Sequence, residues 1–337
     1  MFDLPDYCRT PRLFIDGQWI GGSGDVEAAI TNPASGLPIA TYRSPSVADL
    51  DAALDAAERG FKLWRAVPAF QRGAILHRAA ALLRERTPLI AKVLTLEQGK
   101  PLTEAQGELR VTVEMFDWFA EEGTRAYGRV VPARSPHLQQ QVLREPIGPI
   151  AAFAAWNFPA RNPGYKIAAA LAAGCSCVVK PAEETPLTCL LLAQGLADAG
   201  LPAGVLNVVY GDPQTLASHV IASPVIRKIS FTGSTRIGQL LAMQAAQYAK
   251  PATLELGGHA PVLVFDDADI DLAVRQLIPS KYRNAGQTCI SPTRFLVQSG
   301  VYAKFVGAFT AASASLKVGD GFAEGTQMGP LFHAKRL

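Results

Sequence analysis

The sequence predicts an α/β protein with a doubly wound parallel sheet, followed by a second α/β unit that is incomplete. From residue 148 onward, short apolar runs alternate with helical segments and are bounded by Gly and Pro, which is typical of parallel strands joined by right-handed crossovers. New apolar runs follow Leu254, and the chain ends before a second sheet would be finished. The length of 337 residues also suits about two domains.

The first third of the chain is predicted to be a β-hairpin followed by packed helices. The dipeptide Asp16-Gly17 lies between two apolar runs, as in a hairpin turn, and a turn-rich loop follows at residues 32–38. Ser46 and Asp49 form a capping-box-like start for the first of four helices, and Gly99 should end the third. The acids of these helices are interpreted as a solvated face, so we expect no chemistry from this region alone.

Four apolar runs are predicted to be the parallel strands, at residues 150–154, 175–179, 205–209 and 227–231. Ligands of such sheets bind beyond the carboxyl ends of the strands, so residues after each run are the first functional candidates. Before the sheet, the polar stretch 129–144 is predicted to be an extended hairpin that pairs with another subunit. The second unit begins with runs at Pro261–Phe265 and Phe295–Val297.

Composition excludes several classes of protein. The chain has 32 Lys and Arg against 29 Asp and Glu, a net charge of +3 without basic runs, so neither nucleic acid nor an anionic membrane is an expected partner. No segment predicts a signal peptide or a membrane span. Five cysteines, an odd number, favour a reducing, cytoplasmic compartment. Cys175 and Cys177 have no second ligand pair for zinc, so we expect core thiols and no metal site.

Two strand ends carry residues suited to a phosphate-bearing ligand, although no G-x-G-x-x-G is present. Gly233-Ser234 stands between a strand and a helix, where the helix amides can face an anion, but a plain tight turn explains it equally well. Lys180 and Glu183 follow another strand and could hold ribose hydroxyls, or they could be a surface pair. Each pattern alone is weak.

Three further residues could act on a carbonyl compound. Asn157, next to Trp156 after the first predicted strand, offers an amide donor for an oxyanion, although a helix cap is the commoner role. Glu255 lies in an apolar run, either on an exposed strand face or in a pocket where it could be a general base. Cys289 lies in a polar loop, the setting of a reactive thiolate, and a Cys–His hydrolase stays an alternative.

Taken together, these segments resemble the NAD(P)-dependent aldehyde dehydrogenase superfamily. The resemblance rests on motifs in the family's order: WNFP at Trp156, KPAEETP at Lys180, FTGS at Phe231, LELGG at Leu254 and NAGQTC ending at Cys289. MGP at Met328 also belongs to the pattern. LEQGKP and EPIGP resemble the succinate-semialdehyde dehydrogenase-like branch.

The resemblance implies a mechanism and a cofactor. Cys289 would attack the aldehyde, Asn157 and the Cys289 N–H would hold the oxyanion, and Glu255 would activate water to hydrolyse a thioester. Because related CoA-acylating enzymes lack this Glu, the acid-forming reaction on a small semialdehyde is expected. Cofactor contacts would map to Trp156, Lys180, Glu183, Gly211, Gly233 and Ser234. Glu183 would repel a 2′-phosphate, so NAD is expected rather than NADP.

The resemblance also implies a division of the chain. Residues 1–128 and 145–254 would form the NAD-binding domain, 129–144 an oligomerisation hairpin of a homo-oligomer, and 255–337 an incomplete catalytic domain. Family members continue past MGP through a Glu-x-Phe segment that this sequence lacks. The sequence therefore predicts a C-terminally truncated aldehyde dehydrogenase, with a non-catalytic remnant that binds NAD as the alternative.

Overall fold

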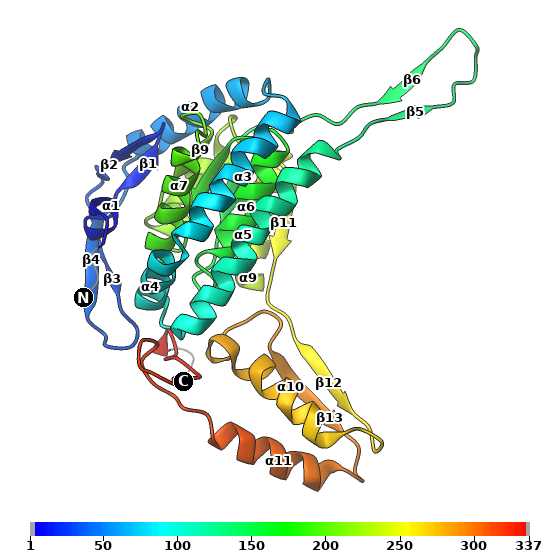
Figure 1. The fold of residues 1–337 in the computed structure, drawn as a ribbon. Coiled ribbons are helices and arrows are strands. Elements are labelled where there is room, and N and C mark those ends of the chain that lie inside the picture. Colours follow the sequence, from blue (N-terminus) through cyan, green and yellow to red (C-terminus); the bar gives the residue numbers. More distant parts are fainter. Residues whose placement is uncertain (1–3, 335–337) are drawn as a thin grey trace.

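The computed structural model describes residues 4–334, which contain a large sheet covered by helices on both faces (Figure 1). Its strand order is β11-β10-β7-β8-β9-β1-β2. The first five strands in this order are parallel, and β1 and β2 are antiparallel additions at one end. The bounds are β7 Ile150–Phe153, β8 Cys177–Lys180, β9 Leu206–Val208, β10 Lys228–Thr232, β11 Ala252–Glu255, β1 Leu13–Ile15 and β2 Gln18–Ile20.

The predicted doubly wound sheet is confirmed, but it is wider than the four strands expected. Strand β11 pairs with β10, so Glu255 ends a strand of this sheet instead of opening the second unit. The β1–β2 hairpin turns at Asp16-Gly17, both with positive φ as a tight hairpin requires, and β1 then pairs with β9. The turn-rich loop at 32–38 is the tip of another hairpin, whose strands are β3 Glu27–Thr31 and β4 Pro38–Arg43.

Helices cover both faces of the sheet. Helices α2 and α9 contact one face, with α8 packed against both of them, and α6 and α7 contact the other face. Helices α3, α4 and α5 pack on α6 and α7 as a further layer. Their bounds are α2 Val47–Trp64, α3 Ala69–Glu85, α4 Thr87–Gln98, α5 Leu102–Thr124, α6 Arg161–Ala172, α7 Leu187–Asp198, α8 Pro213–Ala222 and α9 Thr235–Gln247; a short α1, Asp6–Arg9, precedes them.

The predicted helix boundaries in this layer have the expected local causes. Ser46 and Asp49 form a complete capping box at the start of α2. Gly99 ends α4 in the left-handed conformation with φ +91°, which glycine adopts without steric cost.

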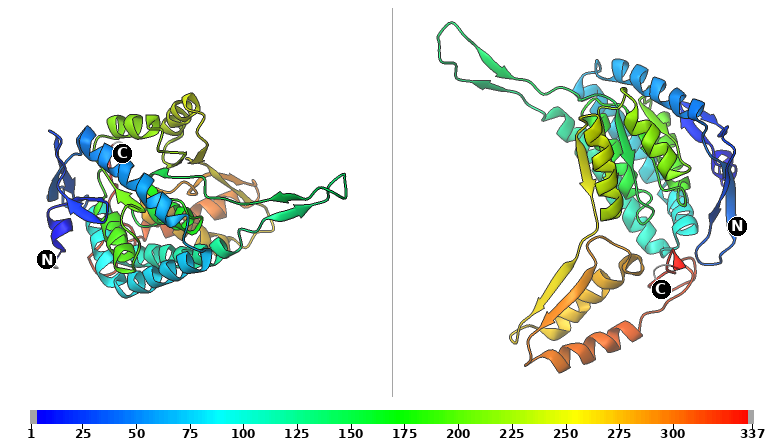
Figure 2. Two further views of the ribbon diagram at one scale, coloured as in Figure 1. Left: turned by 90° about the horizontal axis from the view of Figure 1, so that it is seen from above. Right: turned by 180° about the vertical axis from the view of Figure 1, so that it is seen from behind.

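The stretch 129–144 projects from the body as an antiparallel hairpin of β5 Arg129–Val131 and β6 Gln140–Val142 (Figures 1 and 2). Both strands are mostly exposed, and Val130 is 77 % exposed. The extended hairpin was predicted, and its pairing with another subunit stays a prediction.

A smaller α/β unit follows β11 (Figure 1). Parallel strands β12 Ala260–Val264 and β13 Pro292–Val297 pack with α10 Ile270–Tyr282 and α11 Tyr302–Ala314 around a small core that includes Val264 and Phe305. Leu263 and Leu296, paired neighbours on these strands, are each 59 % exposed. The segment after α11 returns to the large unit, where Leu102 donates to the Gly321 carbonyl. No helix within residues 4–334 is long and apolar enough to cross a membrane.

Candidate active site

The carboxyl ends of all five parallel strands carry residues that the sequence analysis singled out. In sheet order they are Glu255 at the end of β11, Gly233-Ser234 after β10, Asn157 after β7, Lys180 at the end of β8 and Gly211 after β9. The chain proceeds from β7 through β8 to β9 on one side and from β10 to β11 on the other, so a topological switch point lies between β7 and β10. Crevices at such points bind ligands in open α/β sheets.

A cavity of about 480 Å³ lies at this edge and brings several of these residues together with Cys289. Asn157, Glu255 and Cys289 all line it, as do Trp156 and Gly233-Ser234. The large sheet supplies Asn157 and Glu255, whereas Cys289 comes from the loop between α10 and β13. The cavity is therefore formed between the two units of the chain.

Cys289 differs from the other cysteines in its surroundings. Of the five, which all lie in the described part of the chain, Cys289 alone is exposed. Burial raises the pKa of Cys175, Cys177 and Cys189, which keeps these thiols protonated. The predicted contrast between one accessible loop thiol and core thiols is thus present in the structure.

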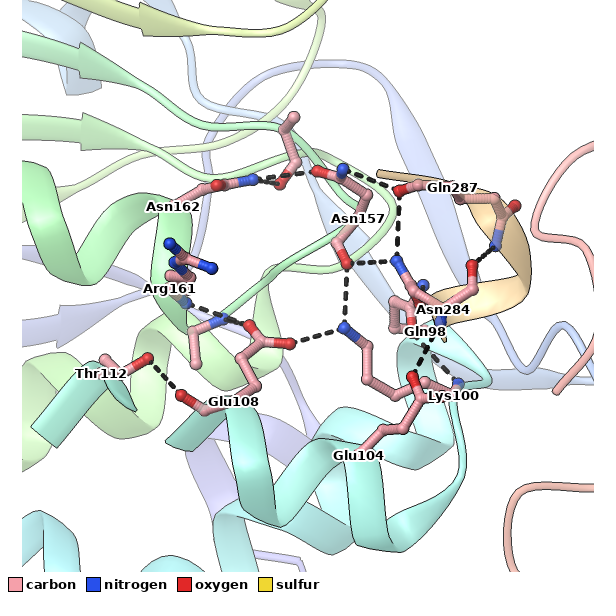
Figure 3. Close-up of polar contacts among 12 residues, drawn as sticks. Gln98, Lys100, Glu104, Glu108, Thr112, Asn157, Arg161, Asn162, Asn284 and Gln287 are labelled. Atoms are coloured by element: carbon pink, nitrogen blue, oxygen red, sulfur yellow. Dashed lines mark hydrogen bonds and ion pairs between the residues drawn. The ribbon is translucent and has the colours of Figure 1, made fainter. Parts of the chain in front are cut away.

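The loop that carries Cys289 begins with an unusual backbone. Within the 3-10 segment Arg283–Gly286, both Asn284 and Ala285 adopt positive φ, +53° and +55°. Such conformations are costly for residues other than glycine and persist only where the surroundings fix them. Asn284 is 1 % exposed and its side chain is held by several hydrogen bonds, which supplies that fixation (Figure 3).

The amide orientation of Asn157 follows from its hydrogen bonds (Figure 3). Asn162 on α6 donates to Asn157 Oδ1 at 3.0 Å, so the other end of the amide carries the NH₂. Asn157 Nδ2 donates to the Gln287 carbonyl at 2.9 Å, two residues before Cys289 in sequence. The donor end of the amide therefore faces the loop of the candidate nucleophile.

Glu255 is on the exposed face of an edge strand, the first of the two alternatives left open by the sequence, yet it also lines the cavity. Its backbone carbonyl accepts from the Gly233 N–H at 3.0 Å, which fixes the end of β11 against the turn after β10. Gly257 and Gly258, which line the same cavity, follow it. The carboxylate thus has access to solvent and to the space beside Cys289.

The remaining cofactor candidates lie farther along the same edge. Lys180 is buried and forms an ion pair with Glu183, which is partly exposed, so the two are a specific contact rather than a surface pair. Ser234 caps α9, and its Oγ accepts from the Ile237 N–H. A Cβ on Gly233 would lie 2.3 Å from the Phe231 ring, and one on Gly211 would lie 2.8 Å from Pro45, so only glycine fits at either place.

Sequence reasoning missed a buried cation close to this site. Lys166 on α6 is 8 % exposed, and its Nζ donates to Ser230 Oγ on β10 at 3.0 Å. Burial lowers the pKa of Lys166 to about 8, while the Glu255 carboxylate opposes that shift. Its only sequence signal was a single lysine at the head of the apolar, Ala-rich run 167–173.

A second cavity of about 220 Å³ adjoins the first, and Phe158 lines both. Three arginines from different elements line it: Arg110 on α5, Arg161 at the start of α6 and Arg283 before the Cys289 loop. The guanidinium groups of Arg161 and Arg283 lie 6.0 and 5.8 Å from the centre of the Phe158 ring. Within residues 4–334, no group of His, Cys, Asp and Glu side chains is arranged to hold a metal ion.

Comparison with known proteins places this chain among enzymes. The family model described as "Aldehyde dehydrogenase family" matches residues 19–337. The 4-(hydroxymethyl)benzenesulfonate dehydrogenase of Comamonas testosteroni is 47 % identical over 97 % of this chain and 68 % of its own length. GabD of Escherichia coli, a succinate-semialdehyde dehydrogenase [NADP(+)], is 44 % identical over 97 % of this chain and 68 % of its own.

Solved structures agree. A succinate-semialdehyde dehydrogenase from Burkholderia pseudomallei superposes with a TM-score of 0.95 at 43 % identity, over 98 % of this chain and 69 % of that one. An aldehyde dehydrogenase from Brucella melitensis biovar abortus 2308 gives a TM-score of 0.97 at 43 % identity, over 99 % and 70 %. The chain thus spans about two thirds of the length of these relatives.

Proposed function

The chain belongs to the aldehyde dehydrogenase family, and we propose that it oxidises an aldehyde carrying an anionic group to the carboxylic acid, with NAD as oxidant. The family and its semialdehyde dehydrogenase relatives support aldehyde oxidation as the reaction type. One observation carries the assignment of residues: Cys289, Glu255 and Asn157 line a single cavity at the switch point of the sheet. That cavity contains a nucleophile, a base and an oxyanion donor.

The proposed reaction uses these three side chains in order. The Cys289 thiol gives up its proton to solvent, Sγ forms a bond to the aldehyde carbon, and the carbonyl oxygen becomes an oxyanion held by the Asn157 amide and the Cys289 N–H. Re-formation of the carbonyl expels a hydride and leaves a thioester on Cys289. Acceptance of that hydride is the chemistry that NAD would supply when bound. Glu255 then removes a proton from water, and the resulting hydroxide attacks the thioester carbon. The carbon–sulfur bond breaks, the acid leaves, and the proton held by Glu255 restores the Cys289 thiol.

The residues along the sheet edge fit a dinucleotide. Gly233, Ser234 and Thr235 line the cavity where α9 begins, so the backbone N–H groups of this helix start are placed to bind a phosphate there. Trp156 lines the same cavity, the ribose site at Lys180 and Glu183 would lie at the end of the neighbouring strand β8, and Gly211 lies one strand farther along, after β9. We assign the adenosine ribose hydroxyls to Glu183 and therefore favour NAD. Since GabD is named for NADP, the cofactor preference is a point for direct measurement.

The arginine-lined cavity supports an anionic substrate. Three guanidinium groups around about 220 Å³ favour a carboxylate or sulfonate at the far end of the aldehyde. The relatives' names describe such compounds, among them succinate semialdehyde, glutarate semialdehyde and 3-sulfolactaldehyde. We therefore propose a small semialdehyde, or its sulfonate counterpart.

The division of labour in the chain is part of this proposal. Residues 1–128 and 145–254 would bind NAD, 255–337 would contribute the nucleophile, and the hairpin 129–144 would contact a second copy of the chain. The alternative is a protein that binds NAD without turnover. Only a measurement of aldehyde oxidation distinguishes this alternative from the proposed enzyme.

A paired-substrate assay tests the proposal. We expect NADH release with succinate semialdehyde, and a kcat/KM for it at least about tenfold above that for uncharged butyraldehyde, because a charge-assisted hydrogen bond contributes about 1.5–3 kcal/mol. Arg161→Leu should abolish this preference, whereas Arg84→Leu, which removes a surface arginine, should preserve it. Equal rates for both aldehydes would refute the anionic substrate. NAD binding without NADH release from any aldehyde would establish the non-catalytic alternative.

A further inference from the structure

A buried ion pair lies behind the site, in the region where the sequence suggested only a solvated face. Lys100, between α4 and α5, and Glu108, on α5, have side chains that are 0 % and 2 % exposed. Their Nζ and Oε2 atoms are 2.6 Å apart. Both residues border the arginine-lined cavity, but side chains with so little exposed surface cannot contact a molecule inside it.

The pair holds the segment that carries Asn157 at two points (Figure 3). Lys100 Nζ donates to the Asn157 backbone carbonyl at 3.0 Å. Glu108 Oε1 accepts from the N–H groups of Ala160 and Arg161, at 2.9 and 3.0 Å, where α6 begins. The connection from β7 to α6, residues 154–160, is thereby fixed at Asn157 in its middle and at Ala160, its last residue.

The same Asn157 carbonyl is a contact point for the nucleophile loop. Asn284 Nδ2 donates to it at 2.8 Å, and Gln98 donates to Asn284 Oδ1 at 2.8 Å. The Asn284 N–H also donates to Glu104 Oε2 at 2.8 Å. One oxygen atom thus joins the turn 98–100, the oxyanion donor and the left-handed start of the Cys289 loop.

Stability alone is a poor explanation for this arrangement. Removing two charges from water costs several kcal/mol per ion, and a buried pair is often no more stabilising than apolar side chains of similar volume. Burial accordingly lowers the pKa of Lys100, an effect that the Glu108 carboxylate opposes. What the pair supplies, and apolar groups would not, is directional contact with one carbonyl and two amides.

We propose that Lys100 and Glu108 are positioning residues, which hold the Asn157 amide at the place where the oxyanion forms next to Cys289. This inference rests on the proposed function, because it assumes that Asn157 is the oxyanion donor. Neither side chain touches substrate. Their effect is transmitted through the Asn157 carbonyl and the start of α6.

Two reactions of the same sulfur separate positioning from general structural support. Acylation by p-nitrophenyl acetate forms the Sγ–carbonyl bond through an oxyanion and then releases p-nitrophenolate. Alkylation by iodoacetamide forms an Sγ–carbon bond, releases iodide and passes through no oxyanion. Neither reaction needs a cofactor, so both rate constants are measured on the 337-residue chain. Each is normalised to the amount of Cys289 thiol, which thiol titration determines.

We expect Lys100→Met to lower the acylation rate constant by about tenfold or more, since misplacing an oxyanion donor costs a large part of its effect. The alkylation rate constant should change less than about threefold. Glu108→Gln keeps an oxygen acceptor for the α6 amides, so it should show a smaller drop in the ratio of the acylation rate constant to the alkylation rate constant. This variant provides the test if Lys100→Met fails to fold. Trp64→Phe, which removes a buried bond to the Leu171 carbonyl far from Asn157, should lower the melting temperature without changing the ratio.

Asn157→Ala tests the oxyanion role of Asn157 separately from the positioning role of Lys100 and Glu108. It should lower the acylation-to-alkylation ratio by about 10²-fold or more, and Lys100→Met should add nothing in that background. An unchanged ratio in Asn157→Ala would refute the oxyanion assignment of the proposed function. A reduced ratio in Asn157→Ala with an unchanged one in Lys100→Met and Glu108→Gln would overturn the positioning inference alone.

Discussion

Glu97 on α4 should make the stability of this protein fall as pH rises toward neutrality. The side chain is 0 % exposed, and its two oxygens accept from the N–H groups of Leu187 and Thr188 at the start of α7, each at 2.8 Å. These contacts and the helix N-terminus favour the carboxylate, but desolvation is the larger effect and raises the pKa of Glu97 to about 8.

The sign follows from proton binding. The folded-state pKa of Glu97 lies above the unfolded value of 4.5, so between these pH values the folded protein keeps a proton that the unfolded chain releases. The stabilisation is complete below the unfolded pKa and is lost as pH rises through the folded one, at about 1.4 kcal/mol per pH unit. From pH 5 to pH 7 Glu97 should therefore cost about 3 kcal/mol.

Urea unfolding of the wild type and of Glu97→Gln at pH 5, 6 and 7 measures this effect. The variant cannot titrate at this position, so the difference in unfolding free energy between the two proteins should shift by about 3 kcal/mol across the series. Other titrating groups cancel in the difference. Parallel pH profiles would refute the reasoning and would mean that the α7 amides keep Glu97 ionised.

Three further predictions concern the proposed chemistry. Cys289→Ala should abolish ester acylation while NAD still binds, as measured by fluorescence titration. In the wild type, iodoacetamide should label Cys289 first, as measured by mass spectrometry of the peptides. Earlier labelling of a buried cysteine would refute the assignment of Cys289 as the nucleophile. Glu255→Gln should release about one NADH per site in a rapid burst and then stall at the thioester, whereas loss of the burst itself would place Glu255 before hydride transfer. Glu183→Ser should shift the kcat/KM preference toward NADP by roughly tenfold, less than an unpaired charge would give because Lys180 partly neutralises Glu183; an unchanged NAD:NADP ratio would place selectivity elsewhere.

The sequence by itself determined four of the five parallel strands, the helix boundaries at Ser46 and Gly99 and the candidate residues, because each depends on local chemistry. An apolar run bounded by Gly and Pro specifies a strand without reference to its neighbours, and the capping box at Ser46 and the left-handed Gly99 are local in the same sense. Cys289 could be separated from the core thiols because its loop lacks the periodicity of a packed segment. The family could be identified from the sequence because its motifs are short local segments that occur in the family's order.

Only the tertiary structure decided which of these residues meet. Asn157, Glu255 and Cys289 are far apart in sequence and share a cavity because parallel strands bring their carboxyl ends to one edge of a sheet. The interpretation of the helix acids as a solvated face was wrong at Glu108 for the complementary reason. Charged residues on an amphipathic helix have the same sequence pattern whether they face water or a second helix, and burial is set by what packs against them. Here α6 and the Cys289 loop cover them, so their charges become directed contacts to Asn157 and α6.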